Sequence, residues 1–398
     1  MTSVVIQGSI FDGRDFFENG VVVVDEATGL ISDCGKAGDV QLPKDARKTI
    51  SGEKLTVLPG LIDAHVHFFG STRYDLMEWV TTPDALVALR SVDHMKRLLY
   101  AGFTAVRDLG SKVGTHLSQA VNEGVIEGPR VISAAKSLAQ TGGNDDPKIL
   151  PLDIAQELSY SYYCDSPWEA RKAVRLCLRD GAEVIKVYAS GSFAQGGKPR
   201  VQLTVEELKA IVDESHTNGI KVAAHAYGEA ALMNAVEAGV DSIEHGIGLT
   251  PEIAGQAKKK GIFYVPTLTP YLGAKPSTNK DREGLIKRHI TQDMEVAKQA
   301  GLKITCGSDF IGADNEMHGQ NYQEIVSIAK FFGAKAALMA ATETAADCLG
   351  LSNAGKIKKG ADATLVVVKG NPLENVEWLA PGNVQHVLKL GKIYTPAS

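Results

Sequence analysis

The sequence lacks the features that would place it in a special class of protein. No apolar run approaches the length of a transmembrane helix, and residues 1–13 lack the segments of a signal peptide. The five cysteines are scattered without a Cys-x-x-Cys pair, which favours reduced thiols over a disulfide framework. The net charge of -5 provides no basic footprint for nucleic acid or an anionic membrane. We therefore expect a cytoplasmic protein with neither partner.

What the sequence does contain is typical of a globular enzyme. Hydrophobic residues make up 44% of the chain and charged residues 22%, so disorder is not expected. The 398 residues exceed the usual size of a single hydrophobic core. We therefore expect one large α/β domain accompanied by a smaller domain.

Short strands separated by turn residues are predicted at both ends of the chain. These strands are residues 3–7, 20–25, 30–33, 363–368 and 384–389. Neither end has enough strands to bury a core alone. We therefore predict a composite β-sandwich domain from residues 1–57 and 359–398, flanking a barrel of residues 58–358.

Between the two ends, a helix, a glycine and an apolar strand follow one another repeatedly. One of these helices is predicted over residues 282–300, and another over residues 204–218 begins with a capping box of Thr204 and Glu207. The predicted strands are residues 61–67, 104–107, 130–133, 183–188, 220–225, 240–245, 262–266 and 302–306. Alternating strands and helices require a parallel sheet with helical crossovers. Eight such units over roughly 250 residues favour a (β/α)8 TIM barrel. A doubly wound open sheet has the same periodicity and is the competing architecture.

The first of these strands carries an arrangement typical of a metal ligand pair. Apolar residues alternate with Asp63, His65 and His67, so the two histidines project from one face of the strand. Two neutral imidazoles placed in this way can chelate a metal such as zinc. A pair of hydrogen-bonded histidines would give the same pattern, and the interpretation therefore depends on the other strands.

Polar residues also occur at the carboxyl ends of the later strands. Lys186, His225 and His245 lie in strands four, five and six, and Asp309 follows strand eight. These ends meet at the rim that carries the active site of a (β/α)8 barrel. Because accident would seldom place so many potential ligands at one rim, we predict a single site that includes all of these residues together with the first-strand histidines.

At these residues the sequence resembles the amidohydrolase superfamily, in its imidazolonepropionase-like and prolidase-like branch. The matching motifs are Pro-Gly-Leu-Ile-Asp-Ala-His-Val-His at 59–67, Ile-Lys-Val at 185–187, Ala-His-Ala-Tyr-Gly at 224–228, Ile-Glu-His-Gly at 243–246, Gly-Ser-Asp at 307–309 and Gly-Ala-Asp-Ala-Thr-Leu-Val-Val at 360–367. The motifs occur in the family's order and span nearly the whole chain. This branch includes Xaa-Pro dipeptidases and N-acyl amino acid hydrolases.

The resemblance implies two divalent metal ions, usually Zn2+. The implied ligands are His65, His67 and Asp309 for one ion and His225 and His245 for the other, with N6-carboxylated Lys186 as the bridge. Burial of an ammonium lowers its pKa and exposes a neutral amine, which suits carboxylation by CO2. A lysine that extends out to solvent is the alternative. In the implied reaction Asp309 acts as general base and then general acid in cleavage of an amide C–N bond.

Three further residues are candidate substrate contacts. Tyr227 follows His225 on the same face, and its hydroxyl could bind a substrate carboxylate or carbonyl, or its ring could pack on a helix. His318 matches a family loop that closes on the substrate, although an exposed loop histidine is equally compatible. Asn144 stands where the family often has the histidine of Thr-Gly-Gly-His, and it can form hydrogen bonds but cannot titrate.

Long loops after strands one, three and seven supply aromatic residues near the predicted rim. These residues are Tyr160, Tyr162, Tyr163, Trp168 and Tyr271. They could line an apolar substrate pocket or form subunit contacts, and we expect a homo-oligomer. Loops of this length in a compact domain usually serve function.

We expect a binuclear metallo-hydrolase that cleaves dipeptides or N-acyl amino acids. The alternative is a hydrolase or deaminase of a cyclic amide, lactone or heterocycle on the same scaffold. Imidazolonepropionase-type relatives use one metal and lack the bridging lysine, so Lys186 argues against that branch. A catalytically inactive scaffold is disfavoured because the six implied ligands are all retained. The leaving residue could be proline, basic or aromatic.

Overall fold

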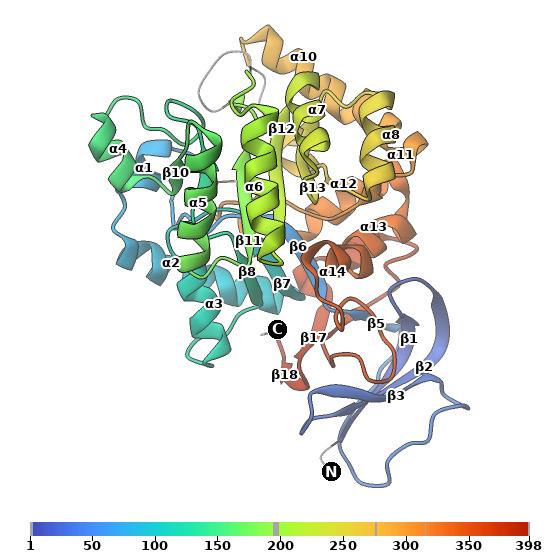
Figure 1. Cartoon of the computed structure of the whole chain (residues 1–398). Helices are drawn as coiled ribbons and strands as arrows, with labels where there is room; N and C mark the ends of the chain where they lie inside the picture. The colour runs from blue at the N-terminus through green and yellow to red at the C-terminus, as the bar shows by residue number, and fades with distance from the viewer. Residues whose placement is uncertain (1–2, 194–198, 275–276, 315, 397–398) are drawn as a thin grey trace.

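The computed structural model describes residues 3–193, 199–274, 277–314 and 316–396. Figure 1 shows a small sheet at one end of the molecule and a larger body of alternating strands and helices beside it. The first and last strands of the chain lie together in the small sheet, whereas the intervening residues form the larger body.

The smaller part is an eight-stranded sheet built from both ends of the chain. The strands follow the order β18-β17-β16-β5-β1-β2-β3, and β4 pairs with β1 outside that path. Their bounds are β1 Ser3–Phe11, β2 Phe16–Asp25, β3 Leu30–Lys36, β4 Ala46–Ile50, β5 Leu55–Pro59, β16 Leu365–Lys369, β17 Val384–Lys389 and β18 Lys392–Tyr394. The sequence predicts five of these strands but misses β4, β5 and β18, which are short.

Antiparallel pairing of β16 with β5 joins the two ends of the chain, with Leu365 opposite Pro59. Alternate residues of the strands face a common apolar core that contains Val4, Ile6 and Val22. We propose that this sheet belongs to a domain of residues 1–57 and 359–398, and that residues 58–358 form the barrel domain.

The larger part contains the parallel strands of the predicted barrel. Their bounds are β6 Leu61–Val66, β7 Phe103–Asp108, β8 Arg130–Ser133, β9 Ser137–Ala139, β10 Ser161–Tyr163, β11 Val184–Tyr188, β12 Lys221–Tyr227, β13 Ser242–Ile247, β14 Phe263–Val265 and β15 Lys303–Ile304. β6, β7 and β8 form one parallel ladder, and β9 together with β11 to β15 forms another, with β10 at its edge.

Two junctions close these ladders into a ring. Val66 in β6 bridges Phe310, which lies beyond β15, in a parallel arrangement. At the other junction the backbone N–H of Glu183 donates to the Ser133 carbonyl at 2.8 Å and joins the start of β11 to the end of β8. An open doubly wound sheet would leave two free edges. The eight predicted strands therefore form a TIM barrel.

Helices surround the barrel, as Figure 1 shows clearly for α5 to α8. The bounds of the helices are α1 Leu76–Thr81, α2 Asp84–Tyr100, α3 Gly114–Asn122, α4 Leu152–Leu158, α5 Pro167–Arg179, α6 Val205–Thr217, α7 Glu229–Ala238, α8 Pro251–Lys260, α9 Leu268–Leu272, α10 Lys280–Arg288, α11 Met294–Ala300, α12 Tyr322–Phe332, α13 Ala334–Ala340 and α14 Glu343–Leu349. Two short 3-10 helices, Val376–Leu379 and Pro381–Asn383, precede β17.

Local sequence signals account for several helix ends. Gly239 and Gly261 end α7 and α8 with φ of +86° and +72°, the left-handed conformation expected at a helix C-terminus. Thr204 and Glu207 form the predicted capping box at the start of α6. One prediction is corrected: the single helix expected at 282–300 is interrupted by a π-helical turn, His289–Asp293. There the buried His289 ring donates to the Pro266 carbonyl at 2.8 Å.

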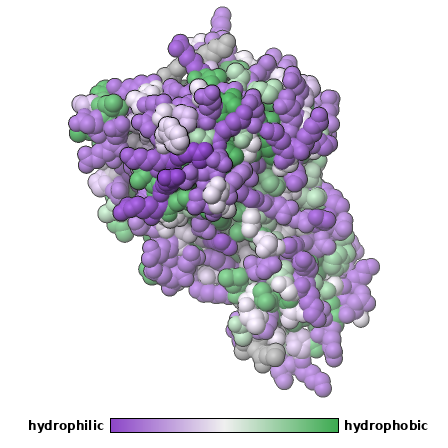
Figure 2. All heavy atoms as spheres, in the orientation of Figure 1, coloured by the Kyte–Doolittle hydropathy of each residue, from purple (hydrophilic) through white to green (hydrophobic). Residues whose placement is uncertain are grey.

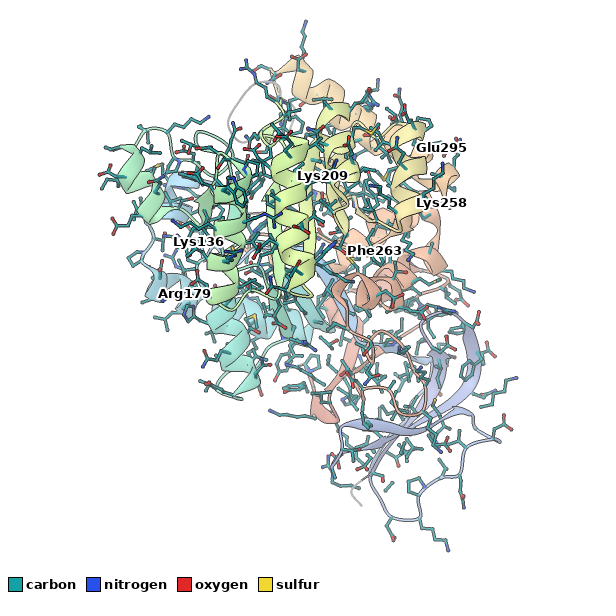
Figure 3. The ribbon with its side chains drawn as sticks, in the orientation of Figure 1. Lys136, Arg179, Lys209, Lys258, Phe263 and Glu295 are labelled. Atoms are coloured by element: carbon teal, nitrogen blue, oxygen red, sulfur yellow. The ribbon has the colours of Figure 1, made fainter. Side chains whose placement is uncertain are left out.

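The surface in Figure 2 is predominantly hydrophilic, with small separate hydrophobic patches. Lys209, Lys258 and Glu295 lie on the outer helices α6, α8 and α11 (Figure 3). Within the described residues, no helix combines the length and apolarity needed to cross a membrane.

Candidate metal centre

Five barrel strands bring the predicted ligand residues to one rim. The residues are His65 and the adjoining His67 at β6, Lys186 in β11, His225 in β12, His245 in β13 and Asp309 after β15. The imidazole rings form a row, with centroid separations of 5.3 Å from His67 to His65, 5.1 Å from His65 to His245 and 4.7 Å from His245 to His225. The four rings and Lys186 are buried.

The Asp309 carboxylate lies among these rings. Its Oδ1 is 3.2 Å from Nε2 of His65 and 3.3 Å from Nε2 of His67, and its Oδ2 is 3.9 Å from Nδ1 of His245. The Asp309 N–H donates to the His65 carbonyl at 2.7 Å and holds the residue at a φ of +60°. Left-handed φ in a residue other than glycine is typical of functional sites. The backbone of Asp309 is therefore fixed at a position from which its carboxylate reaches three histidines.

Hydrogen bonds on the outer nitrogens orient the first two histidines. Nδ1 of His65 donates to Glu244 Oε2 at 2.8 Å, and Nδ1 of His67 donates to the Gly110 carbonyl at 2.9 Å. Each bond places the proton on Nδ1 and leaves an unprotonated Nε2 that faces Asp309. Carboxylate and carbonyl partners of this kind are typical of metal-binding histidines.

A buried ion pair behind His65 was missed by the sequence analysis. Arg107 in β7 donates to Glu244 Oε1 at 2.7 Å and to the Ala64 carbonyl at 2.6 Å. Ser242 also donates to Glu244 Oε1. The available signal was a charged residue in the middle of each of two predicted barrel strands, since a buried charge requires a partner. This pair links three barrel strands and supports the tautomer of His65.

Burial favours the neutral form of three of the imidazoles, those of His65, His225 and His245. It lowers the pKa of His225 to about 3, and the charge of Lys186 acts in the same direction. Burial likewise lowers the pKa values of His65 and His245 well below that of free histidine, with further contributions from the neighbouring cations. Neutral imidazole is the form that binds a metal ion.

Lys186 is enclosed within the same rim. Its Nζ is 3.3 Å from Nε2 of His65 and 5.2 Å from the centre of the Tyr188 ring. Only 1% of Lys186 is exposed, so the alternative of a side chain that extends to solvent does not apply. Burial lowers the pKa of Lys186, although the carboxylates of Glu244 and Asp309 act in the opposite direction.

The rim opens into a cavity of about 730 Å³. Tyr227 and Asn144 line it, as does every predicted ligand residue. The Tyr227 hydroxyl is 2.5 Å from that of Tyr271, which is itself 3.2 Å from Nδ1 of His245. Of the predicted loop aromatics, Tyr160 and Tyr271 line the cavity, and the three others are absent from its described lining.

Asn144 contributes its side chain to the loops around the cavity. Its Oδ1 accepts from the Ser192 N–H at 3.1 Å, and its Nδ2 donates to Asp145 Oδ1 at 3.0 Å. Tyr160 donates to the same oxygen at 2.8 Å. Asn144 therefore connects the loop after β9 with the loop after β11, in addition to lining the cavity.

His318 lies next to the end of β6 and is absent from the described lining of the cavity. Its Nε2 donates to the His67 carbonyl at 3.0 Å, and its ring is 5.2 Å from that of Phe68. The residue is buried, which excludes the exposed loop histidine considered from the sequence. These contacts stabilise the backbone at His67, directly after β6.

These side chains suit divalent metal binding. Ligand atoms of His65, His245 and Asp309 lie within 4.8 Å of one another. Neutral imidazoles with their outer nitrogens hydrogen bonded, next to a carboxylate, form the donor set that zinc and related ions prefer. The additional histidines and the buried lysine amine enlarge this set along the rim.

Comparisons with known proteins agree with this geometry. The model of the amidohydrolase family matches residues 56–394. Ochratoxinase from Aspergillus niger is 32% identical over 419 residues, covering 96% of this chain and 84% of that protein. A prolidase complexed with N-methylphosphonate-L-proline has a TM-score of 0.88 and 33% identity, with 100% of both chains covered. A Xaa-Pro dipeptidase with bound methionine in its active site has a TM-score of 0.86 and 31% identity, covering 99% of this chain and 100% of that chain. The chain therefore belongs to the amidohydrolase family, in its prolidase-like branch, and is a hydrolase of amide C–N bonds.

Proposed function

We propose that this protein is a binuclear metallo-hydrolase that cleaves dipeptides or N-acyl amino acids. The observation that carries the proposal is the buried Lys186 amine, 3.3 Å from Nε2 of His65 and on the same rim as His225 and His245. A single-metal hydrolase has no need of a lysine at this position. The similarity to a prolidase and a Xaa-Pro dipeptidase supports the dipeptide class.

Carboxylation would turn Lys186 from a buried cation into a ligand. The neutral amine adds to CO2 and releases one proton, which gives an anionic carbamate with two oxygens. The lowered pKa of Lys186 favours the neutral amine that this addition needs. His65, His67 and Asp309 would hold one divalent ion such as Zn2+, His225 and His245 would hold the other, and carboxylated Lys186 would serve both as a ligand.

Two bound divalent ions would supply an activated water molecule and polarise the substrate carbonyl. Asp309 would accept a proton from the attacking water and deliver it to the amide nitrogen as the C–N bond breaks. The Asp309 N–H bond to the His65 carbonyl fixes the backbone from which this carboxylate extends. Tyr227, whose hydroxyl faces the cavity beside Tyr271, would hold a substrate oxygen through a hydrogen bond.

Metal content of Lys186→Ala tests this proposal directly. Wild-type protein reconstituted with zinc should bind about two ions per chain, and the variant about one, with loss of amide hydrolysis. Inductively coupled plasma mass spectrometry and a panel of dipeptides and N-acyl amino acids provide the readouts. Added acetate should restore part of the activity, because it supplies the missing bridging carboxylate.

Lys258→Ala is the matched control, since Lys258 is exposed on α8. It should keep the metal content and the activity of wild type. One zinc ion per chain in wild type, unchanged by Lys186→Ala, would refute the carbamate bridge. If the protein cleaved only cyclic amides or lactones, the proposed dipeptide class would be wrong. The alternative hydrolase of cyclic substrates would then replace it.

A further inference from the structure

His245 differs from His65 and His67 in the partner of its outer nitrogen. The outer nitrogens of His65 and His67 bond to a carboxylate and to a carbonyl, which can only accept a proton. Nδ1 of His245 lies instead 2.7 Å from the Thr267 hydroxyl and 3.2 Å from the Tyr271 hydroxyl. Because a hydroxyl can donate or accept, these two distances alone do not place the ring proton. The tautomer of His245 therefore depends on how Thr267 is held.

Thr267 has an unusual backbone conformation. Its φ of +49° and ψ of +53° lie in the left-handed region, which a β-branched residue rarely adopts. Strain of this kind persists only where the surrounding structure imposes it. Thr267 is fully buried and is absent from the described lining of the cavity. Its hydroxyl therefore serves His245 and not a substrate.

Two buried side chains hold the backbone on either side of Thr267. On the preceding side, the His289 ring in the π-helical turn donates to the Pro266 carbonyl at 2.8 Å. On the following side, Glu324 in α12 accepts from the next two backbone N–H groups at 2.8 Å and 2.7 Å. His289 and Glu324 are both 0% exposed. Because these bonds are shielded from water, Thr267 has little freedom to leave the left-handed region.

The hydrogen bond between Thr267 and Tyr271 sets the direction of the contact with His245. Burial raises the pKa of Tyr271 well above its usual value, and the bond from Thr267 acts in the opposite direction. A hydrogen bond that lowers the pKa of a phenol is one that the phenol oxygen accepts. Thr267 therefore donates its own proton to Tyr271 and accepts the Nδ1 proton of His245. Nε2 of His245 is then unprotonated, as metal binding requires.

We propose that Thr267 is a positioning residue that fixes the tautomer of His245, and that Glu324 and His289 act on His245 through Thr267. This inference rests on the proposed function, in which His245 binds a divalent ion. It gives α12 and the π-helical turn a role in metal binding, although neither element contains a proposed ligand.

Thr267→Val tests the hydroxyl, because valine keeps the branched shape without the oxygen. The variant should weaken the zinc site that contains His245 by about tenfold or more, since the ring loses the acceptor of its Nδ1 proton. Thr267→Ser keeps a hydroxyl and should restore most of the affinity. His245→Ala removes the ligand itself and so identifies the zinc ion concerned. Competitive titration with a chelating dye measures the affinities, and inductively coupled plasma mass spectrometry measures the zinc content.

Thr342→Val is the matched control for the loss of a buried hydroxyl. Thr342 is 0% exposed, lies outside the described lining of the cavity, and donates to the Leu338 carbonyl at 2.7 Å. The control should lower the melting temperature and leave every zinc affinity unchanged. Wild-type zinc affinities in Thr267→Val, or an equal loss of affinity in Thr342→Val, would overturn the inference.

Glu324→Gln tests whether α12 acts through Thr267. An amide has one acceptor oxygen where the carboxylate has two, so one backbone N–H group after Thr267 loses its partner. The change should weaken the same zinc site in the wild-type background and have little effect in the Thr267→Val background, where the route to His245 is already broken. Glu324→Asp, which keeps both oxygens on a shorter side chain, gives a second comparison of the two backgrounds. Equal effects in both backgrounds would overturn the role of Glu324.

The zinc data also separate this inference from the proposed function. Two zinc ions per chain, bound with the same affinities by wild type and Thr267→Val, contradict the inference alone. Full zinc binding in His245→Ala contradicts both, because His245 would not be a ligand. A single zinc ion in wild type contradicts only the binuclear proposal, and Thr267→Val then tests the inference on that ion.

Discussion

The floor of the cavity and its walls are built in different ways. The floor consists of the histidines, Lys186 and Asp309, which lie on or directly after barrel strands. The walls consist of Phe69, Trp79, Phe193, Tyr227 and Arg282, most of which belong to loops and outer helices. Floor groups sit in fixed strand register, whereas most wall groups depend on segments that can differ in length and sequence without altering the barrel.

This difference separates reaction from specificity. Hydrogen bonds behind the floor, such as that from His65 to Glu244, leave little freedom for a ligand to change position. Loops on a rigid scaffold commonly carry the groups that choose a substrate. A change in the floor should therefore affect every substrate alike, and a change in the walls should affect some substrates more than others.

The largest expected effect comes from Asp309→Asn in the floor. An amide at this position cannot accept and deliver the proton, so kcat/KM should fall by about 1,000-fold or more on every substrate in the panel. Steady-state kinetics at saturating zinc, with circular dichroism as a check of folding, measure this loss.

Asp314→Asn is the control for that experiment, since Asp314 lines the cavity but lies outside the proposed ligand set. It should retain most of the turnover. If the loss of kcat/KM in Asp309→Asn differed widely between substrates, the distinction between floor and walls would be wrong. Near-normal turnover in this variant would show that Asp309 does not carry the proton.

A smaller effect is expected from Glu244→Gln, which breaks the buried ion pair behind the floor. The change leaves Arg107 without its charge partner and should lower the free energy of unfolding by about 3 kcal/mol or more. Zinc affinity should fall about 10- to 100-fold, since His65 loses its carboxylate partner. Urea unfolding and competitive zinc titration measure the two effects.

The matched control is Glu237→Gln, which breaks an exposed pair. Glu237 accepts from Lys209 at the same 2.7 Å separation, and Lys209 lies on the outer surface of α6 (Figure 3). Loss of this pair should change stability by less than about 1 kcal/mol. If Glu244→Gln and Glu237→Gln lowered the free energy of unfolding equally, burial of the Arg107–Glu244 pair would add nothing to its contribution to stability.

The last effect concerns the pKa of a carboxyl group in the wall. Burial raises the pKa of Glu316 to about 8, with repulsion from Asp309 as a further cause. The folded protein therefore keeps a proton that the unfolded chain loses, and its stability should fall as pH rises from about 4.5 to about 8. The slope from one such group is at most about 1.4 kcal/mol per pH unit.

Metal-free Glu316→Gln should lose this part of the pH dependence in urea unfolding experiments. Glu295→Gln should keep it, because Glu295 is exposed on α11 (Figure 3). A wild-type stability that rises through this pH range, or an unchanged slope in Glu316→Gln, would contradict the raised pKa.

The sequence predicts the floor well for a physical reason. Strand period and strand order together place His65, Lys186 and Asp309 at one rim, because the carboxyl ends of parallel strands must meet. The glycines that end α7 and α8 mark helix ends through their backbone conformation alone. The location in the cell and the oligomeric state stay predictions.

The walls were harder to predict because their contacts are not local. Nothing near Arg282 in the sequence indicates that α10 reaches the cavity, and Phe69 and Trp79 gain their meaning only through stacking on His67. The interruption of the expected helix at His289 likewise depends on a bond to Pro266, which is distant along the chain. His318 was placed near the substrate from a motif, and only tertiary structure reveals its support of the His67 backbone.

The closure of the barrel has a consequence for how the protein matures. His65 lies in the first barrel strand and Asp309 directly after the last, and the Asp309 N–H bond to the His65 carbonyl forms part of the closing seam. A nascent chain cannot present this ligand pair until residue 309 has left the ribosome and docked against β6. Under the proposed metal assignment, metal capture at this pair would therefore be a late step of biosynthesis, because it would require a closed barrel.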